Sequence, residues 1–247
     1  MNISVPEKVL SSLGVPQLVD VYSQLPVNKN YTWGDLAGWR KAEDLTTIAI
    51  HHDYYPKAKR AHLTPMQMMT EIANDHIKST KNEKNGDAGF PYHFYVMRGQ
   101  IFYTNPIAAR TYGVANNNGH TIHVCVHGDY YQSDSLTDAD LNCIIAVCIM
   151  LKGLLPTVQA VKGHGELNPS NCPGFNMERV RNAIITAENR LQQQESWDAK
   201  ITKIRELGNQ YNYMFDRIKL GEQDGNAQWA MNNLLDVYEI MKSKGLL

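Results

Sequence analysis

The sequence of 247 residues predicts an α/β fold, in which helices flank a central mixed β-sheet and a small helical hairpin module follows at the C-terminus. An uninterrupted apolar run, Ile48-Ala49-Ile50, is typical of a strand that is buried on both faces. Further strand-like runs are interspersed with helical patterns over residues 41–191, as in domains where helices cover a sheet. Beyond residue 196, apolar residues recur at steps of four and three, which indicates packed helices.

The elements can be justified in chain order. Residues 1–40 contain three prolines and only short apolar clusters, and we expect them to form a segment that wraps on the domain. The first strand of the sheet follows at 46–51. Thr64 is a typical N-cap residue and Pro65 suits the first helical position, so the apolar residues that follow at helical spacing predict a helix over 65–80.

The middle of the chain carries a strand pattern. Runs at 92–97 and 100–103 predict two strands that turn at Arg98-Gly99 as a hairpin. A loop rich in Asn and Gly then leads to a run of β-branched residues at 121–128, which predicts another strand.

The next segment starts with a helix signal. Thr137 and Asp140 have the spacing of a capping box, and the apolar residues after them repeat with a period of 3.6. We therefore expect a second, core-facing helix. A short strand at 158–161 and a third helix at 176–191 close a domain that spans residues 41–191.

Composition excludes several classes of partner. Lys and Arg number 24 against 25 Asp and Glu, so no basic field favours nucleic acid or an anionic membrane. The N-terminus lacks the apolar run of a secretory signal, and no stretch approaches about 18 continuous apolar residues. We expect synthesis in a cytoplasm, and the placement of the four cysteines implies no disulfide framework.

His51, His164 and Cys172 are the candidate metal ligands. Two neutral imidazoles and one thiolate can hold a zinc ion and leave its fourth position open, which distinguishes a catalytic site from a structural one. His51 ends the buried strand, and the other two bracket a loop that glycines and prolines constrain. Spacing alone leaves a structural role for these side chains equally open.

Other polar residues lie near these ligands in the sequence. Glu166 could orient a ligand imidazole or relay a proton, although a solvated loop carboxylate fits equally well. His120, His123 and His127 allow a second metal site, but strand alternation puts His123 and His127 on one face and His120 off it. Ordinary strand histidines are the alternative.

Four motifs together resemble one family. Ile-Ala-Ile-His-His, Pro-Tyr-His-Phe, Thr-Ile-His-Val-Cys-Val-His-Gly and Gly-His-Gly-Glu-Leu-Asn-Pro-Ser-Asn-Cys-Pro-Gly occur in the order seen in zinc-dependent N-acetylmuramoyl-L-alanine amidases. That superfamily includes bacteriophage endolysins and the peptidoglycan recognition proteins. The resemblance covers about residues 40–190.

The resemblance assigns roles to single residues. It makes His51, His164 and Cys172 the ligands of one zinc ion per chain, and it puts Tyr92 in the place of the family's active-site tyrosine. Ser170 stands where the family often has Lys or Thr, and its hydroxyl brings one hydrogen bond without a positive charge. Tyr112, followed by glycine, stands where many members have a His-Ala that faces substrate. His52, which follows the first ligand, is the other candidate substrate contact, although strand alternation points it away from His51 and favours a structural or supporting role.

The resemblance implies hydrolysis of the amide between N-acetylmuramic acid and L-alanine in peptidoglycan by zinc-activated water, as in a bacteriolytic, antimicrobial phage lysin. Such an enzyme would act on the bacterial cell wall after a membrane lesion. A tyrosine hydroxyl near the metal could stabilise the oxyanion. The alternatives are a non-catalytic peptidoglycan-recognition module and a zinc peptidase that cuts the stem peptide.

The C-terminal pattern predicts a two-helix hairpin over 196–247 that turns within 221–225. The residues at the repeating positions are Trp197, Ile201, Ile204, Tyr211, Phe215, Ile218, Met231, Leu234, Tyr238 and Met241. Two helices cannot bury both apolar stripes alone, so they must pack on the amidase domain, pair with another copy or bind the wall.

Overall fold

The computed structural model describes residues 3–79, 86–219, 236, 239–240 and 242–243. The chain divides into two compact units, residues 1–191 and 192–247. No helix within the described ranges combines the length and apolar character that a membrane crossing requires.

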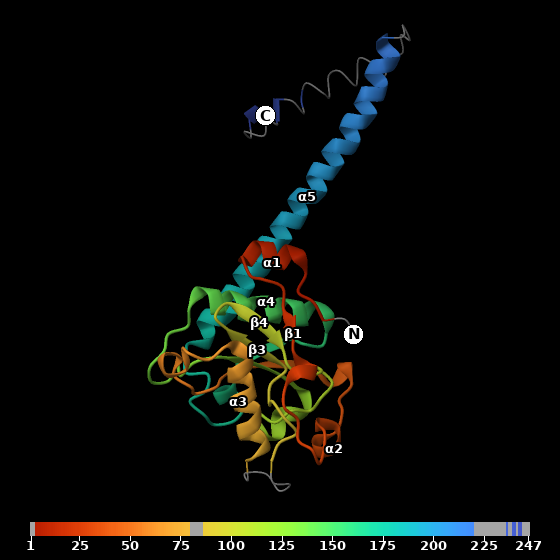
Figure 1. The fold of residues 1–247 in the computed structure, drawn as a ribbon. Helices are drawn as coiled ribbons and strands as arrows, with labels where there is room; N and C mark the ends of the chain where they lie inside the picture. Colours follow the sequence, from red (N-terminus) through yellow and green to blue (C-terminus); the bar gives the residue numbers. More distant parts are fainter. Residues whose placement is uncertain (1–2, 80–85, 220–235, 237–238, 241, 244–247) are drawn as a thin grey trace. The chain divides into compact units, whose positions relative to one another are not determined.

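A six-stranded sheet lies at the centre of the first unit (Figure 1), in the order β1-β4-β3-β5-β2-β6. The strands are β1 (Val19–Asp20), β2 (Thr47–His52), β3 (Phe94–Met97), β4 (Gln100–Tyr103), β5 (Thr121–Val126) and β6 (Ala160–Gly163). β3 and β4 form an antiparallel hairpin, and the other pairings are parallel. The predicted mixed sheet is confirmed, and every residue of β2 and β5 is buried.

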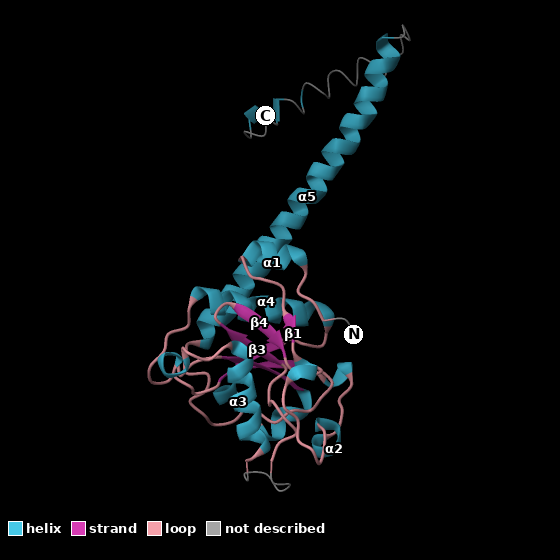
Figure 2. Ribbon diagram, viewed as in Figure 1, coloured by secondary structure: helices cyan, strands magenta, loops and turns pink. Residues whose placement is uncertain are grey.

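Helices cover both faces of this sheet (Figure 2). They are α1 (Glu7–Leu13), α2 (Trp33–Ala37), α3 (Pro65–Ile77), α4 (Asp138–Leu154) and α5 (Met177–Lys219). Alternate residues of β3 separate the two apolar clusters: Phe94 and Val96 join the cluster of α1, α4 and the start of α5, whereas Tyr95 and Met97 join that of α3. The period-2 alternation of a strand thus produces a three-layered unit.

The N-termini of α3 and α4 can be compared with the capping motifs that the sequence predicts. The Thr64 hydroxyl oxygen accepts a hydrogen bond from the Gln67 backbone N–H, and the Gln67 side-chain oxygen accepts one from the Thr64 backbone N–H, as a capping box requires. Thr137 accepts from the Asp140 N–H in the same way. The second bond of the predicted capping box, from the Thr137 N–H to the Asp140 carboxylate, is wrong. The buried carboxylate accepts instead from the Gly99 N–H and from Lys57 Nζ, both at 2.9 Å.

Two expectations about the ends of the domain need correction. Residues 1–40 contain α1, α2 and the edge strand β1, which pairs with β4, so part of this segment is integral to the sheet. The third helix does not end at residue 191, because α5 continues through 192–196 to Lys219. No Pro or Gly stands between residues 177 and 207, and the Gln and Glu residues there favour a helix. The predicted turn within 221–225 lies outside the described residues.

Candidate metal centre

His51 and His164 are brought together by strand pairing. β2 pairs in parallel with β6, and Ile50 lies opposite Gly163 in the register. The next residue along each segment is a histidine: His51 lies on β2, and His164 starts a 3-10 helix directly after β6. The ring centroids of His51 and His164 lie 4.9 Å apart.

Cys172 reaches the same point through a closed loop. The Gly165 N–H donates to the Cys172 carbonyl at 2.8 Å, and the Ser170 Oγ accepts from the Cys172 N–H at 3.1 Å. These bonds fold the loop back beside the end of β2, where the His52 N–H donates to the Cys172 Sγ at 3.3 Å. A backbone donor aimed at sulfur is suited to a thiolate ligand.

The three ligand atoms all lie within 4.8 Å of one another, and His51 Nδ1 is 3.9 Å from Cys172 Sγ. Tetrahedral zinc with bonds of about 2.0–2.3 Å holds neighbouring ligand atoms about 3.3–3.6 Å apart. Small side-chain movements would therefore complete the coordination. His51 and Cys172 are buried and His164 is half-buried, so the centre is open to one side. The donor set and its geometry fit zinc.

Burial sets the protonation of the ligands. It lowers the pKa of His51 well below the usual range, with His123 and His164 adding to the effect, and it also lowers the pKa of His164. Burial raises the pKa of the Cys172 thiol to about 12, against the opposing effect of the His52 N–H. The metal-free centre at neutral pH therefore holds two neutral imidazoles and a protonated thiol.

Tyr92 lies beside the candidate ligands. Its ring centroid is 5.2 Å from that of His51, and its carbonyl accepts hydrogen bonds from Thr104 and Asn105 that fix the backbone. Burial, followed by the nearby thiols of Cys125 and Cys172, raises the pKa of its hydroxyl well above the usual value. The hydroxyl therefore stays protonated and can act as a hydrogen-bond donor.

Ser170 and Glu166 hold the ligand loop. Besides its bond to Cys172, the Ser170 hydroxyl lies 3.3 Å from the Tyr54 hydroxyl. Glu166 accepts from the Gly163 N–H at 2.6 Å and from Arg181 at 3.0 Å. Although partial burial opposes the change, these donors lower the pKa of Glu166.

The placement of Glu166 gives no support to a role in orienting a ligand imidazole, and the proton relay stays a prediction. Among the described hydrogen bonds, none joins its carboxylate to a ligand imidazole. Its contacts instead anchor the start of the loop to α5, since Arg181 belongs to that helix.

The two candidate substrate contacts differ. Tyr112 is half-buried, and its hydroxyl donates to the Leu36 carbonyl at 3.3 Å. His52 is 1% exposed, and its Nδ1 accepts from the Tyr130 N–H while its ring lies 3.8 Å from that of Tyr54. His52 is thus enclosed by tyrosines, and this placement gives no support to direct contact with a substrate.

The other histidines form no second group of possible metal ligands in the described part of the chain. Within the part of the chain that the structure describes, only His51, His164 and Cys172 group as possible ligands. His120 ends a 3-10 helix (Ala115–His120), whereas His127 pairs with Asp53 at 2.8 Å.

Two buried polar groups near the centre escaped the sequence analysis. The Asp53 carboxylate accepts from Tyr95, His127 and Gly128 at 2.6, 2.8 and 3.0 Å. The Arg40 guanidinium donates to backbone carbonyls of four residues, and burial lowers its pKa to about 10. Asp53 stands two residues after His51, a proximity that could have indicated it; an isolated arginine gives no such signal.

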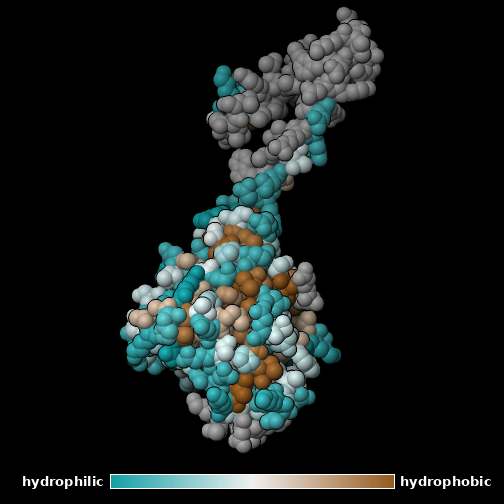
Figure 3. All heavy atoms as spheres, in the orientation of Figure 1, coloured by the Kyte–Doolittle hydropathy of each residue, from teal (hydrophilic) through white to brown (hydrophobic). Residues whose placement is uncertain are grey.

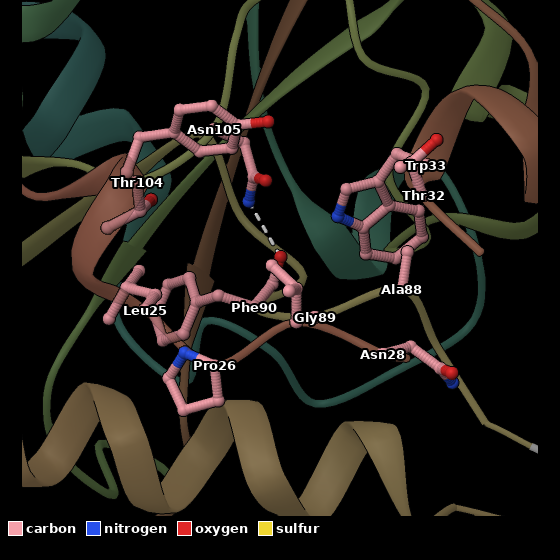
Figure 4. A pocket seen from close by; sticks show the side chains of 12 residues that line it. Leu25, Pro26, Asn28, Thr32, Trp33, Ala88, Gly89, Phe90, Thr104 and Asn105 are labelled. Atoms are coloured by element: carbon pink, nitrogen blue, oxygen red, sulfur yellow. Dashed lines mark hydrogen bonds between the residues drawn. The ribbon is translucent and has the colours of Figure 1, made fainter. Parts of the chain in front are cut away.

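A cavity of about 270 Å³ lies beside Phe90 and Trp33 (Figure 4), and its lining includes none of the three candidate ligands. Its wall residue Phe90 contacts the Tyr92 ring at a centroid distance of 5.7 Å, and Trp33 contacts the Tyr112 ring at 5.5 Å. Val27, at its rim, is 65% exposed, and Figure 3 shows further apolar patches on this unit. The indole nitrogen of Trp33 points toward the cavity and has no partner among the described residues.

Known proteins share this fold. The endolysin N-acetylmuramoyl-L-alanine amidase LysCS from Clostridium intestinale URNW is 21% identical with a TM-score of 0.51, covering 69% of this chain and 96% of its own. The Ph2119 endolysin of a Thermus scotoductus bacteriophage is 20% identical with a TM-score of 0.50, covering 68% and 98%. Bumblebee PGRP-SA is 15% identical with a TM-score of 0.51, covering 68% and 95%.

These likenesses define a class of fold. The first unit has the α/β fold that endolysin amidases and peptidoglycan recognition proteins share. No family model and no curated relative matches the sequence.

Proposed function

We propose that this protein is a zinc-dependent N-acetylmuramoyl-L-alanine amidase that cleaves the bond between N-acetylmuramic acid and L-alanine in bacterial peptidoglycan. The observation that carries the proposal is the convergence of His51, His164 and Cys172 at one edge of a sheet with the endolysin amidase fold. Neither the fold nor the three ligands would be sufficient alone, because one fold serves many activities.

His51, His164 and Cys172 would hold one zinc ion per chain. When bound, zinc supplies Lewis-acid chemistry, since it polarises a carbonyl and lowers the pKa of water in its open coordination position. Because His164 is the half-buried member of the set, substrate would approach from its side.

Tyr92 would donate a hydrogen bond to the oxyanion that forms when the scissile carbonyl becomes tetrahedral. Its raised pKa keeps the proton on the hydroxyl, and its fixed backbone holds the ring against His51. Removal of one such donor costs about 3–4 kcal/mol in comparable enzymes. Ser170 would hold the ligand loop in place, because its hydroxyl oxygen accepts a hydrogen bond from the Cys172 N–H.

The apolar cavity behind Tyr92 and Tyr112 would receive a part of the glycan-peptide substrate. Its wall residues Phe90 and Trp33 contact the two tyrosine rings, and the Tyr92 ring contacts His51, so a group bound in the cavity would be separated from the ligands by these side chains.

The fold also favours a second candidate, a non-catalytic peptidoglycan-recognition module, because PGRP-SA shares it. The assembled ligand set supports the amidase. A zinc peptidase that cuts the stem peptide would use the same metal but expose different amino termini.

Product analysis of digested peptidoglycan tests the proposal. The zinc-loaded protein should release peptides with new L-alanine amino termini and leave lactyl carboxylates on the glycan, without new reducing sugars. Cys172→Ala should abolish release, whereas Cys143→Ala, at another buried cysteine in α4, should retain it. Binding of wall fragments without release would favour the recognition module, and new termini elsewhere in the peptide would indicate a peptidase.

A further inference from the structure

The two ring nitrogens of His51 face different partners. Nδ1 lies 3.9 Å from Cys172 Sγ, on the side of the other ligands, and Nε2 lies 3.0 Å from Nδ1 of His123. If Nδ1 gives its lone pair to a metal, Nε2 carries the proton of the neutral ring. The His123 Nδ1 then accepts that hydrogen bond.

His123 is itself held firmly. It is fully buried on β5, directly opposite Ala49 of β2, so its side chain shares a face of the sheet with His51. Its backbone N–H donates to His93 Nδ1 at 3.0 Å, and its ring stacks on the His93 ring with a centroid distance of 5.5 Å. His93 is fixed in turn by the Ala109 carbonyl at 2.9 Å from its Nε2.

Gly113 leaves room for this pair of imidazoles. A Cβ atom at this position would lie 2.9 Å from His123 Nδ1 and 3.3 Å from His51 Cε1. Gly113 is not among the glycines with positive φ, so the backbone does not require glycine here. The requirement is space for the two rings at their point of contact.

We infer that His123 is a positioning residue for the metal centre: it accepts the His51 Nε2 proton and thereby presents His51 Nδ1 to the ion. The inference rests on the proposed function for the identity of the ligand set. Outer hydrogen bonds of this kind fix the tautomer and orientation of metal-binding histidines, and their loss typically weakens metal affinity 10–100-fold.

The test compares zinc affinities of the full chain, measured by competition with a chromogenic chelator. His123→Leu removes the acceptor and should weaken zinc binding about 10–100-fold. His123→Asn can place an oxygen near the Nδ1 position and should remain within about threefold of the native affinity. His76→Asn on α3, where Nδ1 pairs with Asp87, is the matched control and should leave the affinity unchanged.

A second readout follows the ligand geometry. Co²⁺ bound in place of zinc should show the charge-transfer band of the Cys172 thiolate, shifted by His123→Leu and restored by His123→Asn. Native zinc affinity in His123→Leu would overturn the inference, as would equal losses in the Leu and Asn variants. If His123→Leu does not fold, His123→Gln replaces it, because its longer side chain carries the oxygen past the Nδ1 position.

These outcomes are separable from those of the proposed function. A native protein that binds zinc but cleaves no peptidoglycan would refute the amidase and leave the role of His123 intact. Cleavage of peptidoglycan by the native protein, together with unaltered zinc affinity in His123→Leu, would support the amidase and refute the role of His123.

Discussion

Zinc binding should release one proton from Cys172 and therefore tighten as pH rises. In the metal-free centre the pKa of this thiol is raised to about 12 by burial, whereas the pKa values of His51 and His164 are lowered. At pH 7–8 the imidazoles are already neutral and the thiol is still protonated. The ion must displace the thiol proton, since the thiolate is the ligand.

The magnitude follows from the count of protons. One proton released per ion makes the association constant rise about tenfold for each pH unit, which is about 1.4 kcal/mol of binding free energy. Zinc affinity rises with pH because binding lowers the pKa of the thiol. The metal-bound state therefore holds fewer protons than the metal-free state, and a higher pH favours it.

Calorimetry in buffers of different ionisation enthalpy measures the number of protons released. Because water on the bound ion can also ionise, the decisive value is a difference: Cys172→Ala should release one proton fewer than the native protein. Cys143→Ala should release as many as the native protein. Equal proton release in Cys172→Ala and native protein would refute the assignment of Cys172 as a thiol that becomes a ligand.

Three further predictions concern catalysis and stability. Tyr92→Phe should lower kcat about 100- to 1,000-fold with unchanged zinc affinity, because only the oxyanion donor is lost; an unchanged kcat would contradict that role. Burial lowers the pKa of His51, His93 and His123, so the unfolded chain binds protons that the folded chain rejects. Urea titrations of the metal-free protein should therefore show a free energy of unfolding that falls as pH decreases below about 6.5. Each histidine contributes up to about 1.4 kcal/mol per pH unit. A free energy of unfolding that does not change with pH in this range would contradict the lowered pKa values. Asp140→Ala should lower the free energy of unfolding by about 2 kcal/mol, because it leaves the Gly99 N–H and the Lys57 ammonium without their acceptor. An unchanged urea midpoint would contradict this role of Asp140.

Local sequence patterns predicted the elements that carry the site. The apolar run before His51 indicated β2, and the Arg98-Gly99 turn indicated the β3–β4 hairpin. His51 lies near the end of a strand and the other two residues bracket a loop of glycines and prolines, which made the three residues candidate ligands; the resemblance to zinc amidases then assigned them that role. These signals act over short distances, so the sequence displays them directly.

The long-range contacts could not be predicted in this way. Asp140 has the spacing of a capping box, yet its carboxylate binds Gly99 and Lys57, which are far away in the sequence. In the sequence Gly113 is one of several loop glycines, and only the fold brings the rings of His51 and His123 against it. Both are set by tertiary packing, which overrides local propensity.

The C-terminal residues leave part of the prediction untested. The apolar side chains that recur at steps of four and three after residue 196 lie outside those described, so wall binding and self-association of this module both stay predictions. Light scattering of the full chain at several concentrations would distinguish a dimer from a monomer.

X-ray absorption at the zinc edge tests the metal centre most directly. For zinc-loaded native protein it should show two nitrogen neighbours at about 2.0–2.1 Å, one sulfur at about 2.3 Å and one further light atom. The sulfur should vanish in Cys172→Ala and persist in Cys143→Ala. A spectrum without sulfur, or a shell closed by four protein ligands, would contradict an open centre built from His51, His164 and Cys172.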